Sequence, residues 1–286
     1  MKGIILAGGD GTRLNPITIS YSKQLVPIFD KPLIYYPLTT LMNLNIRDIL
    51  IIVKTNQKQN FEKLLKDGSQ FGLNISYAIQ DNPNGIAEAL IIGENHYKNE
   101  NVALILGDNI FYGHDISNSI DKINITNKGV IFLYQVSDPT RYGVANFNGK
   151  KIIKIIEKPK QPKSNFAVTG LYIYDKNVKT HIRNLKPSKR NELEITDLNN
   201  IYANKNKIEY IKLNNTSVWF DAGTFNSLLH ASQYIQALQE RKNIVIASPE
   251  EIAFKKKYIS RLELKKLIKK MPKNSYSRVL CNLLKD

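Results

Sequence analysis

Short apolar runs alternate with longer amphipathic segments along the first half of the chain. The runs have the length of buried strands, and the segments between them carry apolar residues at the three- and four-residue spacing of helices. The expected strands are residues 2–7, 49–53, 102–106 and 130–136, and the expected helices are residues 33–44, 61–66 and 87–97. The alternation predicts an α/β fold with a doubly wound, mainly parallel, Rossmann-like sheet, whose strands end at one ligand-binding edge.

The middle of the chain has the pattern of antiparallel strands. Residues 142–147 and 151–157 flank Asn148-Gly149, a dipeptide typical of hairpin turns. Residues 166–174 have a further strand pattern, so we expect an antiparallel extension of the sheet. The helical patterns that follow cover residues 225–241 and 249–270. We interpret the chain as one globular unit with a helical C-terminal appendage.

A glycine-rich loop follows the first expected strand. Gly8, Gly9 and Gly11 let the backbone approach a bulky anion, because no Cβ stands in the way. Successive N–H groups in such a turn can cradle phosphate oxygens, and Arg13 and Lys23 add positive charge beside them. The pattern indicates a nucleoside triphosphate site. It matches neither a Walker loop nor the dinucleotide fingerprint, which needs a third glycine.

Composition and charge narrow the class of protein. The 286 residues are 42% hydrophobic, which suits a sizeable core, and the single cysteine, Cys281, forms no internal disulfide. With no signal peptide pattern and no apolar run of membrane-spanning length, we expect a cytoplasmic protein without a membrane partner. The net charge of +16 raises nucleic-acid binding as an alternative, but the lysines are scattered. We expect no nucleic-acid partner, and a positive field that gathers anionic substrates.

Two aspartates at the ends of expected strands are candidates for a magnesium site. Asp108 follows residues 102–106, and Asp221 precedes the helix at 225–241. Mg²⁺ binds few protein oxygens together with substrate phosphates, so two carboxylates at one sheet edge would suit it. Taken singly, Asp108 is more simply a turn residue, and Asp221 is equally a helix cap.

Several polar residues could contact a sugar phosphate. Glu157 can accept sugar hydroxyls while Lys158 pairs with a phosphate, and a surface ion pair is the alternative for both. Arg190 is either a phosphate ligand or an exposed charge at a helix start. Trp219 either packs on a ligand or fills the core.

Amide side chains and one glycine could contact a base. Gln24 and Gln80 offer both a donor and an acceptor, and Gly85 would let backbone approach the base. An ordinary turn is the alternative for each. The four histidines show no metal-binding spacing, and we find no Ser-His-Asp or Cys-His arrangement.

Taken together, these motifs resemble those of the sugar-1-phosphate nucleotidyltransferases, and most closely the glucose-1-phosphate thymidylyltransferase family. The resemblance extends over essentially the whole chain. The stretches that carry it are residues 6–14, 22–28, 30–38, 106–114, 138–144, 157–159, 168–172 and 192–197. Lys23-Gln24-Leu25 and Tyr35-Tyr36-Pro37-Leu38 are the most discriminating.

The resemblance implies an enzyme that transfers a thymidylyl group from dTTP to glucose 1-phosphate by direct displacement with Mg²⁺. It implies catalytic roles for Arg13, Lys23, Asp108 and Asp221, with the two aspartates as metal ligands and Arg13 beside the departing pyrophosphate. The implied nucleotide-binding residues are Leu6, Gly8, Gly9, Gly11, Thr12, Arg13, Lys23, Gln24, Gln80, Gly85 and Asp108. The implied contacts to glucose or its phosphate are Asn109, Gly143, Glu157, Lys158, Val168, Arg190 and Trp219.

Domain organisation and assembly follow from the same resemblance. We expect a nucleotidyltransferase domain at residues 1–240, divided into a nucleotide-binding part at 1–130 and a sugar-binding part at 131–240. Residues 241–286 would form the helical appendage of the same unit. The resemblance also implies a homotetramer with a second, regulatory nucleotide site at a subunit interface.

Three alternatives remain at this point. The same chemistry could prefer UTP, because one methyl group supplies only about 1–3 kcal/mol of discrimination. A non-catalytic regulatory subunit should have lost Lys23, Asp108 or Asp221, and all three are present. A nucleic-acid-binding protein would show salt-sensitive retention of oligonucleotides.

Overall fold

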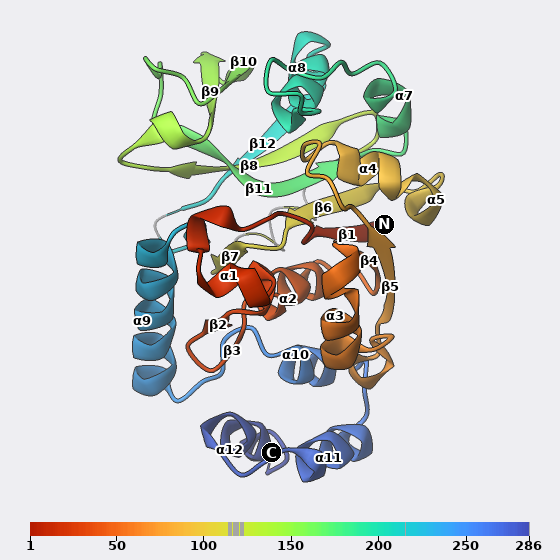
Figure 1. Cartoon of the computed structure of the whole chain (residues 1–286), viewed down its shortest axis with the longest axis vertical. Coiled ribbons are helices and arrows are strands. Elements are labelled where there is room, and N and C mark those ends of the chain that lie inside the picture. The colour runs from red at the N-terminus through yellow and green to blue at the C-terminus, as the bar shows by residue number, and fades with distance from the viewer. Residues whose placement is uncertain (114–115, 117–119, 121–122, 215, 286) are drawn as a thin grey trace.

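The computed structural model describes residues 1–113, 116, 120, 123–214 and 216–285, so the last residue of the motif at 106–114 lies outside them. Within that part of the chain, a nine-stranded mixed sheet forms the centre of the molecule (Figure 1). The strand order is β10-β9-β11-β6-β1-β4-β5, and β8 joins β11 to β12. The strands are β1 (Lys2–Leu6), β4 (Asp48–Val53), β5 (Asn74–Ile79), β6 (Val102–Leu106), β8 (Gly129–Gln135), β9 (Gly143–Asn148), β10 (Lys151–Glu157), β11 (Phe166–Tyr174) and β12 (Ile208–Lys212).

The N-terminal half of the sheet is parallel, as the alternation of strands and helices predicts. β1 pairs in parallel with β4 on one side and β6 on the other, and β4 pairs in parallel with β5. Leu6 lies opposite Leu106 at the carboxyl ends of β1 and β6. The glycine loop and Asp108 therefore leave the sheet at the same edge, which confirms the expected convergence.

The second half of the sheet is mostly antiparallel, which confirms the predicted extension. β11 pairs antiparallel with β6, β8 and β9, and β9 forms a hairpin with β10. The turn of the hairpin contains Gly149 at a φ of 56°, a backbone conformation that favours glycine. β12 adds to β8 in parallel.

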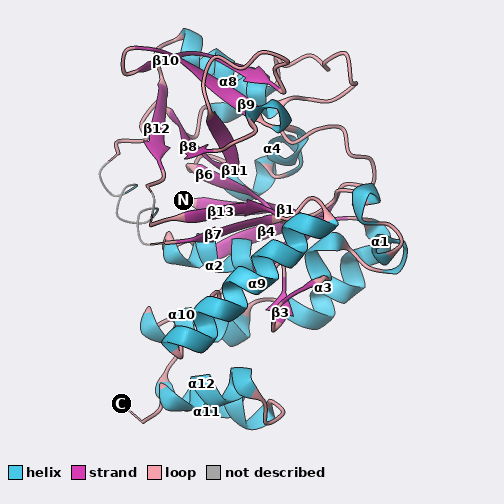
Figure 2. Cartoon of the chain, turned by 90° about the vertical axis from the view of Figure 1, so that its left-hand side faces the viewer, coloured by secondary structure: helices cyan, strands magenta, loops and turns pink. Residues whose placement is uncertain are grey.

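Helices cover both faces of the sheet, because alternate side chains of its strands belong to opposite hydrophobic clusters. Ile5 packs in the cluster that includes α2 and α3, whereas Ile4 packs in the cluster that includes α4 and α8. Figure 2 shows these two layers on either side of the strands. The helices of the first layer are α2 (Tyr35–Asn43), α3 (Lys58–Leu65) and α10 (Pro249–Lys255), and those of the second are α4 (Glu88–Ile92), α5 (Glu94–Tyr97), α7 (Val178–Ile182) and α8 (Ile195–Asn204).

Shorter elements complete the described structure. β7 (Asn109–Tyr112) pairs antiparallel with β13 (Val218–Asp221), and β2 (Pro27–Ile28) pairs with β3 (Lys31–Pro32). The remaining helices are α1 (Ile17–Ser20), α9 (Phe225–Lys242), α11 (Arg261–Lys270) and α12 (Ser275–Asn282). Figure 1 shows α11 and α12 at the opposite end of the molecule from β9 and β10.

Candidate active site

A cavity of about 400 Å³ lies at the carboxyl edge of β1 and β6. Its wall combines side chains from the parallel strands, the β9–β10 hairpin and α8, so distant parts of the chain meet there. The cavity is lined by Arg13, Ile86, Leu106, Asp108, Asn109, Arg141, Tyr142, Gly143, Glu157, Lys158, Val168, Gly170, Tyr172, Ile195, Thr196, Asn199, Trp219, Asp221 and Gly223.

The pairing of β7 with β13 brings the two candidate metal ligands to this cavity. Asp221 lies opposite Asn109 in the ladder, and Ala222 N–H donates to the carbonyl oxygen of Asp108 at 3.0 Å. Asp108 and Asp221 are more than a hundred residues apart in sequence, yet adjacent backbone positions hold both carboxylates at one wall.

Each of these carboxylates is paired with a cation of the chain itself. Lys23 Nζ lies 2.6 Å from Asp108 Oδ2, and Arg141 Nη2 lies 3.0 Å from Asp221 Oδ2. Burial raises the pKa of Asp108, but the charge and hydrogen bond of Lys23 and the hydrogen bond of Asn109 outweigh it, so the pKa lies below its usual value. Burial raises the pKa of Asp221, and the charge of Arg141 offsets that rise in part.

Asn109 connects several parts of the wall. Its Nδ2 donates to Asp108 Oδ1 at 2.9 Å, and its Oδ1 accepts from Trp219 Nε1 at 2.6 Å and from Gly170 N at 3.0 Å. The side chain is buried, and a Cβ at position 170 would lie 2.6 Å from it. The sequence suggests Asn109 as a sugar-phosphate contact, and the structure places it where it orients Asp108 and Trp219.

The glycine loop presents unpaired backbone donors at the edge of the sheet. In the described part of the chain, the six N–H groups of residues 8–13 donate to no protein acceptor. Gly11 has a φ of 63° and begins the short helix at Thr12–Leu14, while a Cβ at Gly9 would meet open space. Arg13 reaches the cavity beside Gly223, whose Cβ position lies 3.6 Å from Arg13 Nη1. A run of free N–H groups next to an arginine suits phosphate oxygens.

The residues suggested for the base lie behind this loop. Gln80 donates from Nε2 to Glu88 Oε2 at 2.5 Å, and a Cβ at Gly8 would lie 2.9 Å from Gln80 Oε1. Gln24 Oε1 accepts from Ser22 Oγ at 2.6 Å. Both glutamine side chains are buried, and neither lines the described cavity.

Gly85 has a packing role that the sequence does not reveal. Its φ is 110°, and a Cβ there would lie 2.4 Å from the carbonyl oxygen of Leu193. Leu193 N–H donates to the Asn84 carbonyl at 2.6 Å, so the two loops touch through their backbones. Glycine at position 85 therefore lets the segment that carries Arg190 dock against the nucleotide side.

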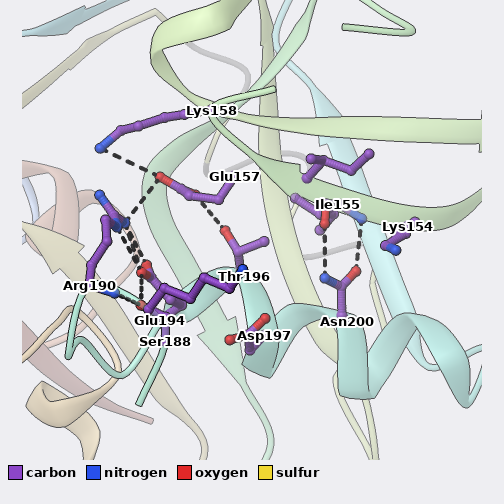
Figure 3. Close-up of a pocket in the computed structure, with 12 residues that line it drawn as sticks. Lys154, Ile155, Glu157, Lys158, Ser188, Arg190, Glu194, Thr196, Asp197 and Asn200 are labelled. Carbon is purple, nitrogen blue, oxygen red and sulfur yellow. Dashed lines mark hydrogen bonds and ion pairs between the residues drawn. The ribbon is translucent and has the colours of Figure 1, made fainter. Parts of the chain in front are cut away.

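The residues suggested for the sugar phosphate divide between two neighbouring cavities. Gly143, Val168 and Trp219 line the first cavity, and Glu157 and Lys158 line both. Arg190 lines the second, where Figure 3 shows its guanidinium turned to Glu194. Arg190 Nη2 lies 2.8 Å from Glu194 Oε1 and 2.9 Å from Oε2, and 3.9 Å from Glu157 Oε1.

Several wall residues were not singled out from the sequence. Arg141 and Tyr142 lie in the motif at 138–144, and Thr196 lies in the motif at 192–197, but motif membership alone gives them no role. Thr196 Oγ1 donates to Glu157 Oε2 at 2.7 Å across 39 positions of sequence. Arg141 meets Asp221 across 80 positions. Both contacts join residues that are distant in sequence, so only the folded structure reveals them.

Two further observations bear on metals and membranes. Within the described residues, no group of three or more His, Cys, Asp or Glu side chains could hold a metal ion by itself. Among the described helices, none is both long and apolar enough to cross a lipid bilayer.

Comparison with known proteins places the chain in a family. The family model for nucleotidyl transferases matches residues 2–237. A glucose-1-phosphate thymidylyltransferase of Neisseria meningitidis serogroup A is 48% identical over 100% of both chains.

Solved structures agree with this placement. A crystal structure of a Bacillus anthracis protein described as a glucose-1-phosphate thymidylyltransferase, in complex with sucrose, matches with a TM-score of 0.77 and 44% identity over 82% of this chain and 94% of that one. A UDP-glucose pyrophosphorylase complexed with UDP-glucose matches with a TM-score of 0.72 and 26% identity over 82% and 98%. The chain belongs to the nucleotidyl transferase family and, within it, to the glucose-1-phosphate thymidylyltransferases.

Proposed function

We propose that this chain uses the cavity at the carboxyl edge of its sheet to transfer a thymidylyl group from dTTP to α-D-glucose 1-phosphate. The observation that carries the assignment of the site is the meeting of the unpaired N–H groups of residues 8–13 with Asp108 and Asp221 at one edge. A phosphate oxygen of glucose 1-phosphate forms a bond to the α-phosphorus of dTTP. The bond from that phosphorus to the β-phosphate oxygen breaks, and pyrophosphate leaves with its electron pair.

The nucleotide side of the site binds and orients the triphosphate. The free N–H groups of residues 8–13 donate to phosphate oxygens, and Arg13 stabilises the charge that develops on the departing pyrophosphate. Lys23, released from Asp108, neutralises a phosphate oxygen near the reacting phosphorus. Catalysis of this kind consists mostly of positioning and charge stabilisation.

Asp108 and Asp221 are suited to hold a divalent cation, which we propose to be Mg²⁺. Their oxygens are hard donors, and two carboxylates leave room for the phosphate and water ligands that Mg²⁺ retains. When bound, the ion would supply positive charge to the reacting phosphates. The two aspartates orient that charge because the β7–β13 ladder fixes their backbones.

The sugar side orients glucose 1-phosphate. Thr196 holds one oxygen of Glu157, which leaves the other for sugar hydroxyls, and Lys158 supplies a charge for the phosphate. The Arg190 guanidinium adds a second cation once it leaves Glu194. Trp219, fixed by Asn109, gives the sugar an apolar wall.

A screen of pyrophosphate release tests the proposed function. Four nucleoside triphosphates, including dTTP and UTP, are crossed with several sugar 1-phosphates, with and without Mg²⁺. We expect the highest kcat/KM for dTTP with glucose 1-phosphate, and no release without a divalent ion. Because the two bases differ by one methyl group, we expect UTP to be disfavoured by about 1–3 kcal/mol. A higher kcat/KM for UTP would reassign the chain to uridylyl transfer.

We also propose a cytoplasmic homotetramer with an interfacial regulatory nucleotide site. A separate cavity of about 470 Å³ supports this proposal, because two lysines line it and it shares no lining residue with the cavity that contains Asp108. Its lining includes Tyr112, Gly113, Lys242, Ser248 and Lys255. Light scattering should give four chains per particle, and Lys242→Ala should weaken inhibition by the nucleotide-sugar product. A monomeric particle, inhibited by the nucleotide-sugar product only in competition with substrate, would overturn the proposed tetramer and its regulatory site.

A further inference from the structure

Arg141 lines the active-site cavity at the end of a short turn. The turn is the 3₁₀ helix Pro139–Arg141, which Asp138 caps by accepting from Thr140 N at 3.2 Å and from Thr140 Oγ1 at 2.6 Å. The Arg141 Cζ atom lies 5.3 Å from the centroid of the Tyr142 ring, and that ring packs edge-on against Trp219 with centroids 5.2 Å apart. The Tyr142 ring therefore supports the guanidinium of Arg141 at the cavity wall.

The guanidinium is incompletely used by the protein. Arginine carries five N–H donors, and among the described residues one hydrogen bond is made, from Nη2 to Asp221 Oδ2 at 3.0 Å. The side chain is 43% exposed. Arg141 can therefore accept a second anionic partner without losing a buried network.

Lys23 and Arg190 are bound more tightly than Arg141. Lys23 is buried, with 7% of its side chain exposed, against Asp108. Arg190 spans both oxygens of Glu194 and has a second carboxylate, Glu192, 3.4 Å from Nη2. Arg141 has one ion-pair contact, to one carboxylate oxygen, so exchange of its anionic partner costs less than it does for Lys23 or Arg190.

Asp221 cannot serve Arg141 and a divalent cation equally, because a cation against the carboxylate repels the guanidinium. We propose that Arg141 is a substrate-binding residue that neutralises Asp221 until the carboxylate is engaged and then pairs with the phosphate of glucose 1-phosphate. The sugar phosphate is the fitting partner, because Arg141 lies on the same wall as Gly143 and Lys158. A guanidinium can hold two phosphate oxygens at once. The inference rests on the proposed function, which supplies this phosphate.

A double-mutant cycle on ligand binding tests the exchange without any turnover. The dissociation constant of glucose 1-phosphate is measured by calorimetry in EDTA for the wild type, Asp221→Asn, Arg141→Gln and the double variant. Asp221→Asn should release Arg141 and tighten binding about fivefold or more, and the double variant should lose that gain. Arg183→Gln, which removes an exposed arginine that follows α7 and pairs with Glu94 of α5, is the matched control and should bind as the wild type does.

The alternative is a general effect of removing a negative charge, which would persist in the Arg141→Gln background. A gain that persists there, or no tightening in Asp221→Asn, overturns the proposal. If Asp221→Asn does not fold by circular dichroism, Mg²⁺ alone replaces it. Mg²⁺ should then tighten sugar-phosphate binding in the wild type and not in Arg141→Gln, and equal tightening in both overturns the proposal. Pyrophosphate release by the wild type is measured in parallel, and its absence would reject the proposed function instead.

Discussion

Asn109 shows how the site depends on side chains that hold other side chains. Its neighbour Asp108 is visible in the sequence, but its contacts to Trp219 and Gly170 require the β7–β13 ladder beside β11. The sequence therefore nominates Asn109 as part of the site. It does not reveal the orienting role, because adjacency to Asp108 does not show which groups donate to the side-chain oxygen of Asn109. The pairs Arg141–Asp221 and Thr196–Glu157 were missed for the same reason.

Replacing Asn109 tests this orienting role. Asn109→Ala leaves two buried N–H groups, of Trp219 and Gly170, without a partner, at about 1–3 kcal/mol for each, and removes one hydrogen bond that orients Asp108. We expect kcat to fall on the order of 10²-fold, a typical cost of a small displacement at a reacting centre. Steady-state kinetics with urea denaturation measure both effects. Asn177→Ala, which removes hydrogen bonds to Asp175 and Asn127, is the control, and an equal loss of kcat there would contradict the assignment.

Gly85 and Gly149 form a matched pair of glycines with positive φ. Gly149→Ala adds a Cβ in open space, so it should cost about 1–2 kcal/mol of stability and leave activity intact. Gly85→Ala places a Cβ 2.4 Å from the Leu193 carbonyl, so the loop that carries Arg190 must shift. We expect a raised KM for glucose 1-phosphate, measured by initial rates. Unchanged KM in Gly85→Ala would show that the docking of this loop does not matter for the sugar.

At the element scale, the sequence predicts the interior better than the edges. The buried strands β1, β4 and β6 are continuous apolar runs, and the predicted bounds match closely. β5 and β12 were missed, because the exposed Ser76 in β5 and the half-buried Glu209 in β12 interrupt their apolar pattern. The helix expected at residues 87–97 is divided into α4 and α5 at Gly93, where a Cβ would lie 2.5 Å from Ile4 Cδ1.

The C-terminal helices join the rest of the molecule through buried polar contacts. Tyr276 on α12 donates to Glu250 Oε2 in the first turn of α10, and its hydroxyl oxygen lies 3.0 Å from Oγ of Ser248, which caps that helix. Lys31, at the start of β3, pairs with Asp30 and donates to Gln239 on α9 at 3.0 Å. From the sequence alone, Lys31 and Glu250 would be expected at the surface. Their buried partners come from distant segments and are seen only in the folded structure.

Glu250 should make stability depend on pH. Burial raises its pKa above the ordinary 4.5, against hydrogen bonds from Tyr276 and Ser248. The folded state then keeps the proton to higher pH than the unfolded state does, so this contribution is complete below about pH 4.5 and is lost as pH rises through the folded-state pKa. Glu250→Gln removes that loss, so its free energy of unfolding relative to the wild type should increase between acidic and neutral pH.

Urea denaturation across that range measures the effect. Glu251→Gln, on the same helix and paired with Lys255, is the control for removing a charge. A constant difference between Glu250→Gln and the wild type at every pH would contradict the role of burial.

At the scale of the whole molecule, net charge and fold act separately on function. The charge of +16 is consistent with several classes of protein. The chemistry is identified by the cavity, where residues that follow β1 and β6 of the large sheet meet Asp221 at the end of β13. The cavity itself is balanced, because Arg13, Arg141 and Lys158 face three carboxylates. The excess charge therefore acts on the approach of anionic substrates more than on their bound state.

Salt should separate these two effects. Between about 0.05 and about 0.3 M salt, screening shortens the range of the positive field, so kcat/KM should fall while kcat stays nearly constant. Initial rates at saturating and limiting substrate measure both. A fall in kcat alone would contradict this prediction, because it would show that salt acts on the bound substrates and not on their approach.

Asp108 and Asp221 are, in the proposed function, the carboxylates at which the thymidylyl group is transferred. The most direct test of this role is the formation of dTDP-glucose and pyrophosphate, quantified by mass spectrometry, by the wild type and by folded Asp108→Asn and Asp221→Asn with Mg²⁺. We expect equal amounts of the two products from the wild type and a loss of about 10²-fold or more in each variant. Turnover near the wild-type rate in either folded variant would contradict this role.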